Sequence, residues 1–377
     1  MIVQELQILN FRNLRFVRAE FEAGLNVIYG ANAQGKTNIL EALYLLVTGR
    51  SFRTTDEREM IPWVRDNYEA PLIRARVEKR TGEERFLVSF NQTDKRIFVN
   101  GEPIHRLGEL IGRINAVLFT PSDLQLVRGS PGGRRRFLDI ELSQISRSYL
   151  HHLQRYDLAL RQRNALLKQH QRRPGLKEEL SSWDPQLVEH GSELTAARSR
   201  ALLALSARSS EAYARIAGAN ERLELVYRPS PSMPDRKEET ISREEARSRL
   251  EAALRNSLEE DIRRGATSVG PHRDDFDFML DGRDARSFGS QGQQRSCVLA
   301  LRLAELRFME EATGEPPLLL LDDLLSELDE SRTRALLESL DPRVQTFITT
   351  TEKALVLSLV KVQRVFLMED GELEAEQ

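Results

Sequence analysis

The chain has 377 residues, of which 40% are hydrophobic and 30% charged, ordinary values for a globular protein. Domains commonly hold about 100–150 residues, so we expect two of them. No apolar run approaches the roughly 20 residues of a membrane-spanning helix, and the first residues lack the apolar core of a secretion signal, so we expect a cytoplasmic protein. Cys297 is the only cysteine, which excludes a disulfide framework and a cysteine-based zinc site within one chain.

The charge is unevenly distributed along the chain. The net charge is −3, which taken alone argues against a nucleic-acid partner. Residues 128–173, however, contain eleven Lys and Arg against three acids, a balance of +8, so the rest of the chain carries −11. Such asymmetry indicates a polyanionic partner for the basic segment.

Strand patterns dominate the N-terminal third. Residues 1–11 alternate polar and apolar side chains, and the apolar run at 25–29 ends in Gly30, as is typical of a buried strand. Apolar residues at helical spacing follow between 35 and 47. Three short β-like runs separated by turn-like segments then predict an antiparallel meander over 72–100.

The middle of the chain has helical patterns. Apolar residues at helical spacing run from 137 to 172, the segment 171–176 breaks them, and a second helical stretch covers 183–218. At 1.5 Å per residue each arm would be roughly 50 Å long, and the pair predicts a short antiparallel helical hairpin. The Pro-rich segment 229–239 predicts a loop, and 242–260 a third helix.

Alternation of strands and helices returns toward the C-terminus, so we expect an α/β fold. The simplest architecture is one lobe formed from both termini, with a mainly helical second domain, the short antiparallel arms, inserted in the middle. The predicted boundaries are 1–120 and 271–377 for the two parts of the first lobe and 121–270 for the helical lobe. The C-terminal strands are expected at 276–280, 317–321, 346–350 and 364–368, and the helices at 291–311 and 330–339.

Residues 30–37 match the phosphate-binding pattern G-x-x-x-x-G-K-[ST], with a predicted strand before them and a helix after them. Glycines let backbone N–H groups turn toward phosphates, and the positive end of the helix adds to their attraction. Lys36 can reach the β- and γ-phosphates, and the Thr37 hydroxyl can hold Mg²⁺. A chance match is expected in on the order of one such chain in a hundred. The predicted ATP-binding residues are Gly30, Ala31, Asn32, Ala33, Gln34, Gly35, Lys36 and Thr37.

A second motif, Pro317 to Asp323, is an apolar strand that ends in two acids. In open α/β sheets ligands bind at the carboxyl ends of the strands, so both carboxylates belong at such a site. Asp322 would hold Mg²⁺ and Asp323 would position or deprotonate the attacking water. The alternative is a strand followed by an Asp-rich cap of the next helix.

Two further segments resemble motifs of the ABC-type ATPases. Ser290, Gly292 and the predicted helix start after them resemble the signature motif, whose serine and glycine in that family press on the γ-phosphate bound by the other subunit. The segment 326–329 resembles the D-loop, which crosses the dimer interface in the same family. Alone, the first would be read as a Gly-containing helix cap, and the second as an N-cap through Asp329 or Ser331.

With these motifs in this order the chain resembles the SMC-like ABC ATPases, and within them the bacterial RecF proteins. The resemblance implies an ABC-type ATPase head and an ATP- and Mg²⁺-dependent, DNA-binding homodimer. It further implies weak DNA-stimulated ATP hydrolysis and roles in replication, recombinational repair of gaps and the SOS response. RecR and RecO would be partners in loading RecA. The stretches that carry the resemblance are NFRN (10–13), GRSFR (49–53), FTPSDL (119–124), GSPGGRRRFLD (129–139), GPHRDD (270–275), GSQGQQR (289–295) and LLLLDDLLSELD (318–329).

The chain departs from the transporter pattern at two catalytic positions. Asp323 stands where transporters usually have glutamate, and the segment 346–351 has threonines but no switch histidine. Both changes favour a slow ATP-gated switch. In SMC-like relatives the region of Arg12 also approaches the nucleotide, which makes Arg12 a candidate ATP ligand; a surface turn is the alternative.

The basic segment contains three consecutive arginines, Arg134, Arg135 and Arg136, which we predict to contact DNA phosphates. Three adjacent residues of a helix cannot share one face, which leaves one of them available for packing. Few aromatic residues lie nearby, so duplex DNA or a duplex end is favoured over stacked single-stranded bases. The alternative is a solvated surface.

Two other functions remain as alternatives. A transporter-type ABC ATPase subunit would need a docking surface for membrane helices, and the helical insertion and the basic segment argue against it. A non-hydrolysing SMC-like DNA scaffold is disfavoured by the complete phosphate-binding motif and the paired acids.

Overall fold

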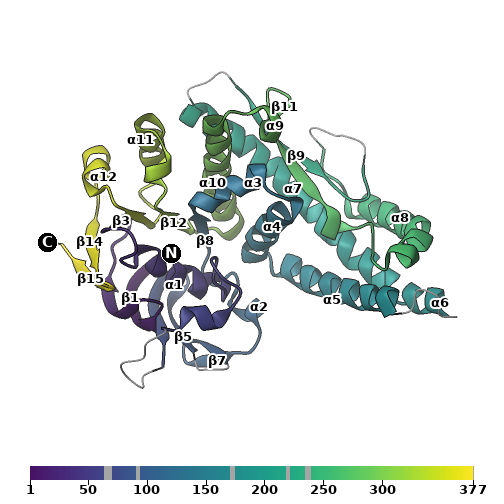
Figure 1. Ribbon diagram of the computed structural model, residues 1–377, viewed down its shortest axis with the longest axis horizontal. Coiled ribbons are helices and arrows are strands. Elements are labelled where there is room, and N and C mark those ends of the chain that lie inside the picture. The colour runs from purple at the N-terminus through teal and green to yellow at the C-terminus, as the bar shows by residue number, and fades with distance from the viewer. Residues whose placement is uncertain (63–69, 91–93, 170–174, 218–220, 234–238, 377) are drawn as a thin grey trace. The chain divides into compact units, whose positions relative to one another are not determined.

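The computed structural model describes residues 1–62, 70–90, 94–169, 175–217, 221–233 and 239–376. The chain forms two compact units, Met1–Asp123 with Glu305–Gln377, and Leu124–Ala304. Both ends of the chain therefore belong to the first unit (Figure 1). The second boundary lies inside helix α10 (Gln291–Thr313), so the segment around Ser290 belongs to the helical unit.

A mostly parallel sheet in the first unit carries the predicted nucleotide motifs. Its strand order is β15-β14-β3-β13-β12-β8, and only β14 and β15 pair antiparallel. Because β3 and β12 both flank β13 in parallel, the segments that follow β3 and β12 leave the sheet at one edge. The strands are β3 (Leu25–Tyr29), β8 (Ala116–Phe119), β12 (Leu318–Asp322), β13 (Thr346–Thr350), β14 (Arg364–Glu369) and β15 (Glu372–Ala375).

A second sheet of the same unit is entirely antiparallel, with the order β2-β1-β4-β5-β6-β7. It contains the predicted meander over 72–100, whose strands alternate buried and more exposed residues as one-sided sheets do. The strands are β1 (Ile2–Phe11), β2 (Leu14–Glu20), β4 (Leu72–Lys79), β5 (Gly82–Phe90), β6 (Lys95–Val99) and β7 (Glu102–Ile104).

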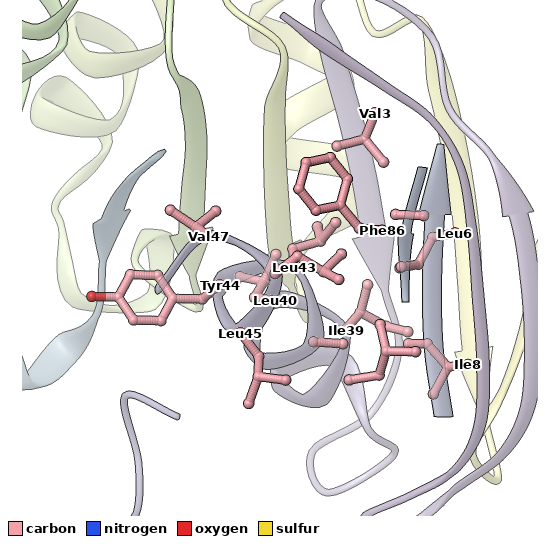
Figure 2. Close-up of a cluster of buried hydrophobic side chains, with 14 of the residues drawn as sticks. Val3, Leu6, Ile8, Ile39, Leu40, Leu43, Tyr44, Leu45, Val47 and Phe86 are labelled. Atoms are coloured by element: carbon pink, nitrogen blue, oxygen red, sulfur yellow. The ribbon is translucent and has the colours of Figure 1, made fainter. Parts of the chain in front are cut away.

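Helix α1 (Lys36–Thr48) lies in the hydrophobic core formed with both sheets. Every residue of α1 except Thr37 is buried, because the helix is apolar on most of its circumference. Figure 2 shows its side chains, among them Ile39 and Leu43, beside Val3 of β1 and Phe86 of β5. This core holds the start of α1 firmly against the sheet that carries the acids. Shorter helices of the unit are α2 (Leu107–Leu110), α11 (Glu330–Ser339) and α12 (Lys353–Leu359), with 3-10 turns at Glu57–Met60, Pro121–Leu124 and Leu325–Glu327.

The second unit is built around an antiparallel pair of helices, as the sequence predicts. Helix α5 (Arg147–Gln169) packs on α7 (Asp184–Ala217): Tyr149 contacts Arg198 near one end, and Arg163 contacts Asp184 near the other. The other helices are α3 (Gln125–Arg128), α4 (Pro131–Ile145), α6 (Leu176–Ser181), α8 (Arg243–Arg264) and α9 (Ala285–Phe288), and a small sheet contains β9 (Leu223–Arg228), β10 (Asp275–Leu280) and β11 (Arg283–Asp284).

The helical pattern over 137–172 proves to be two helices, separated at Ser146. Its backbone is extended, which ends α4, and its hydroxyl accepts a hydrogen bond from the Tyr149 N–H, 3.1 Å away, at the start of α5. Serine is a favoured N-cap residue, and the apolar periodicity continues through it, which is why the pattern alone did not reveal the break.

Two buried arginines hold the second unit together. Arg198 donates to the carboxylates of Asp139 and Asp274, at 2.7 and 2.8 Å, and Arg163 donates to Asp261 at 2.7 Å. Buried charges need such partners, so both arginines are committed to the fold. Within the part of the chain that the structure describes, no helix is long and apolar enough to cross a membrane.

Candidate nucleotide-binding site

The phosphate-binding loop, residues 30–37, connects β3 to α1 and requires glycine at both of its glycine positions. Gly35 has a φ of +118°, and a Cβ there would lie 2.8 Å from the Leu14 side chain and 2.9 Å from that of Asn13. A Cβ at Gly30 would lie 2.2 Å from the carbonyl oxygen of Met368. The loop therefore packs too closely on its neighbours for any side chain at these two positions.

Side-chain amides hold the loop in shape. Asn13 donates to the carbonyls of Ala33 and Gln34, at 3.3 and 3.2 Å, and Asn38 donates to the Asn13 side-chain oxygen at 2.6 Å. Gln34 accepts a hydrogen bond from the Asp370 N–H at 2.6 Å. Residues 31–33, Asn32 among them, lie exposed at the rim of the loop.

Lys36 lies under the loop. Its ammonium donates to the carbonyl oxygens of Gly30 and Ala31, both at 2.8 Å. Burial lowers its pKa, while the nearby carboxylates of Asp323 and Asp322 act in the opposite direction. Three of the predicted site residues, the lysine and the two acids, therefore lie within electrostatic reach of one another.

The Thr37 hydroxyl and the Asp322 carboxylate meet between α1 and β12. The hydroxyl donates to Asp322 at 2.8 Å, and Thr349, at the end of β13, donates to the same carboxylate oxygen at 2.9 Å. Burial raises the pKa of Asp322. A carboxylate and a hydroxyl oxygen on adjacent elements are donors of the type that Mg²⁺ prefers, so these two residues fit the predicted metal site.

Asp323 follows β12 in an unusual backbone conformation. Its φ is +44°, a region that Asp and Asn tolerate better than most residues. Its N–H donates to the Thr349 hydroxyl at 2.9 Å, and its carbonyl accepts from the Ser326 hydroxyl at 2.8 Å. These contacts tie the backbone of Asp323 to Thr349 of β13 and to Ser326 in the turn that follows β12.

Arg12 does not extend into the loop. Its guanidinium forms a two-point ion pair with Glu41 of α1, at 2.6 and 2.8 Å, and donates to the Glu59 carbonyl at 2.9 Å. The Glu41 side chain is fully buried, so it needs this cation. The predicted ATP ligand is thus a structural partner of the helix that begins at the loop.

The two segments that resemble dimer-interface motifs both cap helices. The Ser290 hydroxyl accepts from the Gln293 N–H, and the Gln293 side chain accepts from the Ser290 N–H, which is the reciprocal arrangement of a capping box. Gly292 lies in the first turn of α10. Asp329 caps α11 by accepting from the Arg332 N–H at 3.0 Å. Ser290 is nevertheless exposed, so capping does not remove it from reach of a partner.

Arg134 is buried, which argues against the predicted DNA contact at this residue. Its guanidinium makes a two-point ion pair with Asp275, at 2.6 and 2.9 Å, and donates to the carbonyls of Leu126 and Gly129, both at 3.0 Å. The side chain is 4% exposed. Arg134 is the member of the arginine triplet that serves packing.

The other two arginines of the triplet differ from each other. Arg135 is half-buried and donates to the Asp274 carbonyl at 2.8 Å, and burial followed by the charge of Arg198 lowers its pKa. Arg136 is exposed. Arg136 is therefore the most exposed arginine of the triplet.

Asn38 and Arg53 lie beside the site but carry no sequence motif that predicts their roles. Arg53 donates to the Asn38 side-chain oxygen at 2.7 Å and lies 3.5 Å from the Glu41 carboxylate. Burial raises the pKa of Asp322, and the charge of Arg53 opposes that rise. Arg53 is a second cation beside Glu41, and its position could be anticipated only by knowing that the segment after α1 folds back against that helix. The position of Thr349 likewise follows from the strand order, which places β13 between the two motif-bearing strands.

Comparison with known proteins decides the family. The family model described as "RecF/RecN/SMC N terminal domain" matches residues 2–374. The "DNA replication and repair protein RecF" of Symbiobacterium thermophilum is 48% identical over 354 residues, covering 93% of this chain and 92% of that protein. The protein of the same name from Exiguobacterium sp. is 39% identical, with complete coverage of both chains. The chain belongs to the RecF family.

Solved structures agree with this assignment. The recombination mediator protein RecF-ATP in the RecFOR pathway superimposes with a TM-score of 0.90 at 36% identity, covering all of this chain and 97% of that one. An Smc head bound to the C-winged helix domain of ScpA matches with a TM-score of 0.59 at 14% identity, which shows the shared fold. The RecF-family chain thus has the predicted ABC-type ATPase head with a helical insertion.

Proposed function

We propose that this RecF-family protein is an ATP-gated DNA clamp of recombinational repair and replication. ATP binds at the loop 30–37, two copies close on each other across the nucleotides, and the closed dimer holds DNA. Slow hydrolysis, stimulated weakly by DNA, opens the dimer again. The observation that carries the proposal is the hydrogen bond of 2.8 Å between Thr37 and Asp322, next to a loop whose carbonyls hold the Lys36 ammonium. Relatives of the chain include a RecF-ATP structure.

The chain's own residues have distinct tasks in this proposal. Lys36 exchanges its two carbonyl partners for phosphate oxygens, a change favoured because a charged acceptor bonds an ammonium more strongly than a neutral one. Thr37 and Asp322 hold Mg²⁺, which neutralises phosphate charge when bound. Asp323 accepts the proton of the attacking water. Ser290 and Gly292 complete the site of the partner copy.

The cellular role rests on the family alone. Relatives are named for DNA replication and repair, and one solved relative is a recombination mediator of the RecFOR pathway. We infer from this that the protein supports RecA loading at gaps together with RecR and RecO, and thereby the SOS response.

The dimerisation test uses the full chain and measures mass in solution. We expect dimers with a non-hydrolysable ATP analogue and Mg²⁺, monomers with ADP, and monomers of Lys36→Met under all conditions. Dimers that form equally with ADP or without nucleotide would refute ATP gating.

A mixing experiment tests whether the site is completed by the partner. Lys36→Met has a defective phosphate-binding loop and an intact Ser290 segment, whereas Ser290→Arg has an intact loop and a defective Ser290 segment. Each variant alone should neither dimerise nor hydrolyse ATP. An equal mixture should recover part of both dimerisation and hydrolysis, because each mixed dimer has one intact site, formed by the loop of the Ser290→Arg copy and the Ser290 segment of the Lys36→Met copy. No recovery from two folded variants would contradict completion in trans.

A further inference from the structure

The solvent-facing side of α5 carries a line of cations that the nucleotide site does not use. Arg147, Arg155, Arg161 and Lys168 are all exposed. At about 100° per residue, these four side chains and the exposed His151 fall within an arc of about 140° on the helix. The opposite side of α5 contains the buried Tyr149, Tyr156 and Arg163, which pack into the unit.

We call the four cations of this face, Arg147, Arg155, Arg161 and Lys168, the α5 basic face. Within the described parts of the chain, none of the four forms an ion pair with a carboxylate. Asp157 is the only acid in α5, so the helix carries five cations, the buried Arg163 included, against one anion. Burial and the charge of Asp139 raise the pKa of Asp157, and the charge of Arg161 opposes that rise. Arg161 is therefore partly compensated by Asp157.

Helix α8 of the same unit shows what an ordinary charged surface looks like in this protein. It contains six arginines and six acids, a balance of zero. Each of its arginines forms an ion pair: Arg249 with Glu245 and Arg255 with Glu251, for example, one turn apart on the helix. Arginine is thus abundant on both helices, but only α5 leaves its cations available to an external anion.

We propose that the α5 basic face is the surface that binds the sugar-phosphate backbone of duplex DNA. The inference rests on the proposed DNA-clamp function and names the surface responsible for it. From Arg147 to Lys168 the helix rises about 32 Å, close to the 34 Å of one turn of a DNA duplex. The two tyrosines of α5 are buried, so the face offers charge without a stacking platform for single-stranded bases.

A matched pair of triple variants tests the surface. Arg147→Gln/Arg155→Gln/Arg161→Gln removes three charges from the α5 basic face, and Arg249→Gln/Arg255→Gln/Arg264→Gln removes three from α8. Glutamine preserves helix propensity and the net charge change is equal, so the two variants differ in where the lost charges lie and in whether those charges were ion-paired. Binding to a duplex of about 30 base pairs, three helical turns, is measured with Mg²⁺ and a non-hydrolysable ATP analogue at several salt concentrations.

We expect the α5 variant to lose about tenfold or more in affinity at moderate salt. The slope of log affinity against log salt should fall in magnitude by about 2–3, since each lost phosphate contact removes about 0.9. The α8 variant should stay within about twofold of the unsubstituted protein. Nucleotide-dependent dimerisation, measured in parallel, should be unchanged in both.

Equal losses in the two variants, or no loss in either, would overturn the α5 assignment while leaving the clamp proposal intact. Failure of the unsubstituted protein to bind duplex DNA with nucleotide would overturn both. A loss in the α5 variant without a change in salt slope would show a role other than phosphate contact, and would also overturn the assignment.

Discussion

The Thr37 hydroxyl donates a hydrogen bond to the Asp322 carboxylate, 2.8 Å away, although 285 residues separate the two in the chain. The contact joins the start of α1 to the end of β12 and brings the two predicted Mg²⁺ ligands together. Thr349 donates to the same carboxylate oxygen from the strand between them. The two predicted metal ligands are therefore held in place by the sheet and not by the motifs alone.

Asp322→Asn should change the pH dependence of folding stability and should weaken Mg²⁺-dependent ATP binding. Burial raises the pKa of Asp322 above its ordinary 3.8, so its contribution to stability is complete below pH 3.8 and is lost as pH rises through the higher folded-state pKa. Asparagine keeps an oxygen for both threonines but does not titrate. Without nucleotide, the difference in unfolding free energy between the variant and the unsubstituted protein should therefore change in the variant's favour as pH rises above about 4. The variant should also bind ATP more weakly in the presence of Mg²⁺. Parallel stability profiles from pH 4 to 8 would contradict this.

Gly35→Ala should destabilise the first unit and abolish ATP binding. A Cβ at Gly35 meets Leu14 and Asn13 at less than 3 Å, and the φ of +118° is itself unfavourable for alanine. We expect the unfolding free energy to fall by about 1–3 kcal/mol or more. Gly133→Ala is the matched control, since Gly133 lies in α4 with nothing within 4 Å of the added carbon. It should be neutral or more stable by about 0.5–1 kcal/mol. Similar effects of the two substitutions would contradict the packing argument.

Arg12→Ala should cost about 3–5 kcal/mol of stability, because it leaves the buried Glu41 carboxylate without its two-point partner. Adding Glu41→Gln removes the buried charge that Arg12 had compensated, and the double variant should recover at least half of the loss in urea unfolding. ATP affinity should recover with stability. A stable double variant that still fails to bind ATP would place Arg12 on the nucleotide after all.

His272 should make the protein sensitive to acid. Burial lowers its pKa from 6.5 to about 4, and its ring is held neutral: Nε2 donates to the Thr267 carbonyl at 3.1 Å, and Nδ1 accepts from the Tyr156 hydroxyl at 2.7 Å. The unfolded chain takes up the proton first, so stability is lost as pH falls from about 6.5 to 4, by about 3 kcal/mol.

His272→Gln removes this titration. Its unfolding free energy should be lower than that of the unsubstituted protein at pH 7.5, and the difference should shrink toward pH 4. His105→Gln, at an exposed histidine, should leave the pH profile unchanged. An unaltered profile in His272→Gln would exclude His272 as the source of the acid sensitivity.

Elements with a strong local pattern were predicted within a few residues. Helix α7 covers Asp184–Ala217 against an expected 183–218, and α11 agrees at both ends. The break at Ser146 and the strands β8 and β9 were missed. The two strands depend on contacts with distant segments: β8, for example, pairs with β12, some 200 residues further along the chain.

The nucleotide loop and the paired acids could be recognised from sequence because each is a contiguous motif whose chemistry depends on local order. The roles of the arginines could not, because a guanidinium serves either a buried carboxylate or an external phosphate according to what the fold places beside it. Arg134 and Arg163 face Asp275 and Asp261 and are committed to the interior, whereas Arg147 and Arg155 face solvent. Burial makes an unpaired charge costly, and only the tertiary structure determines which charges are buried.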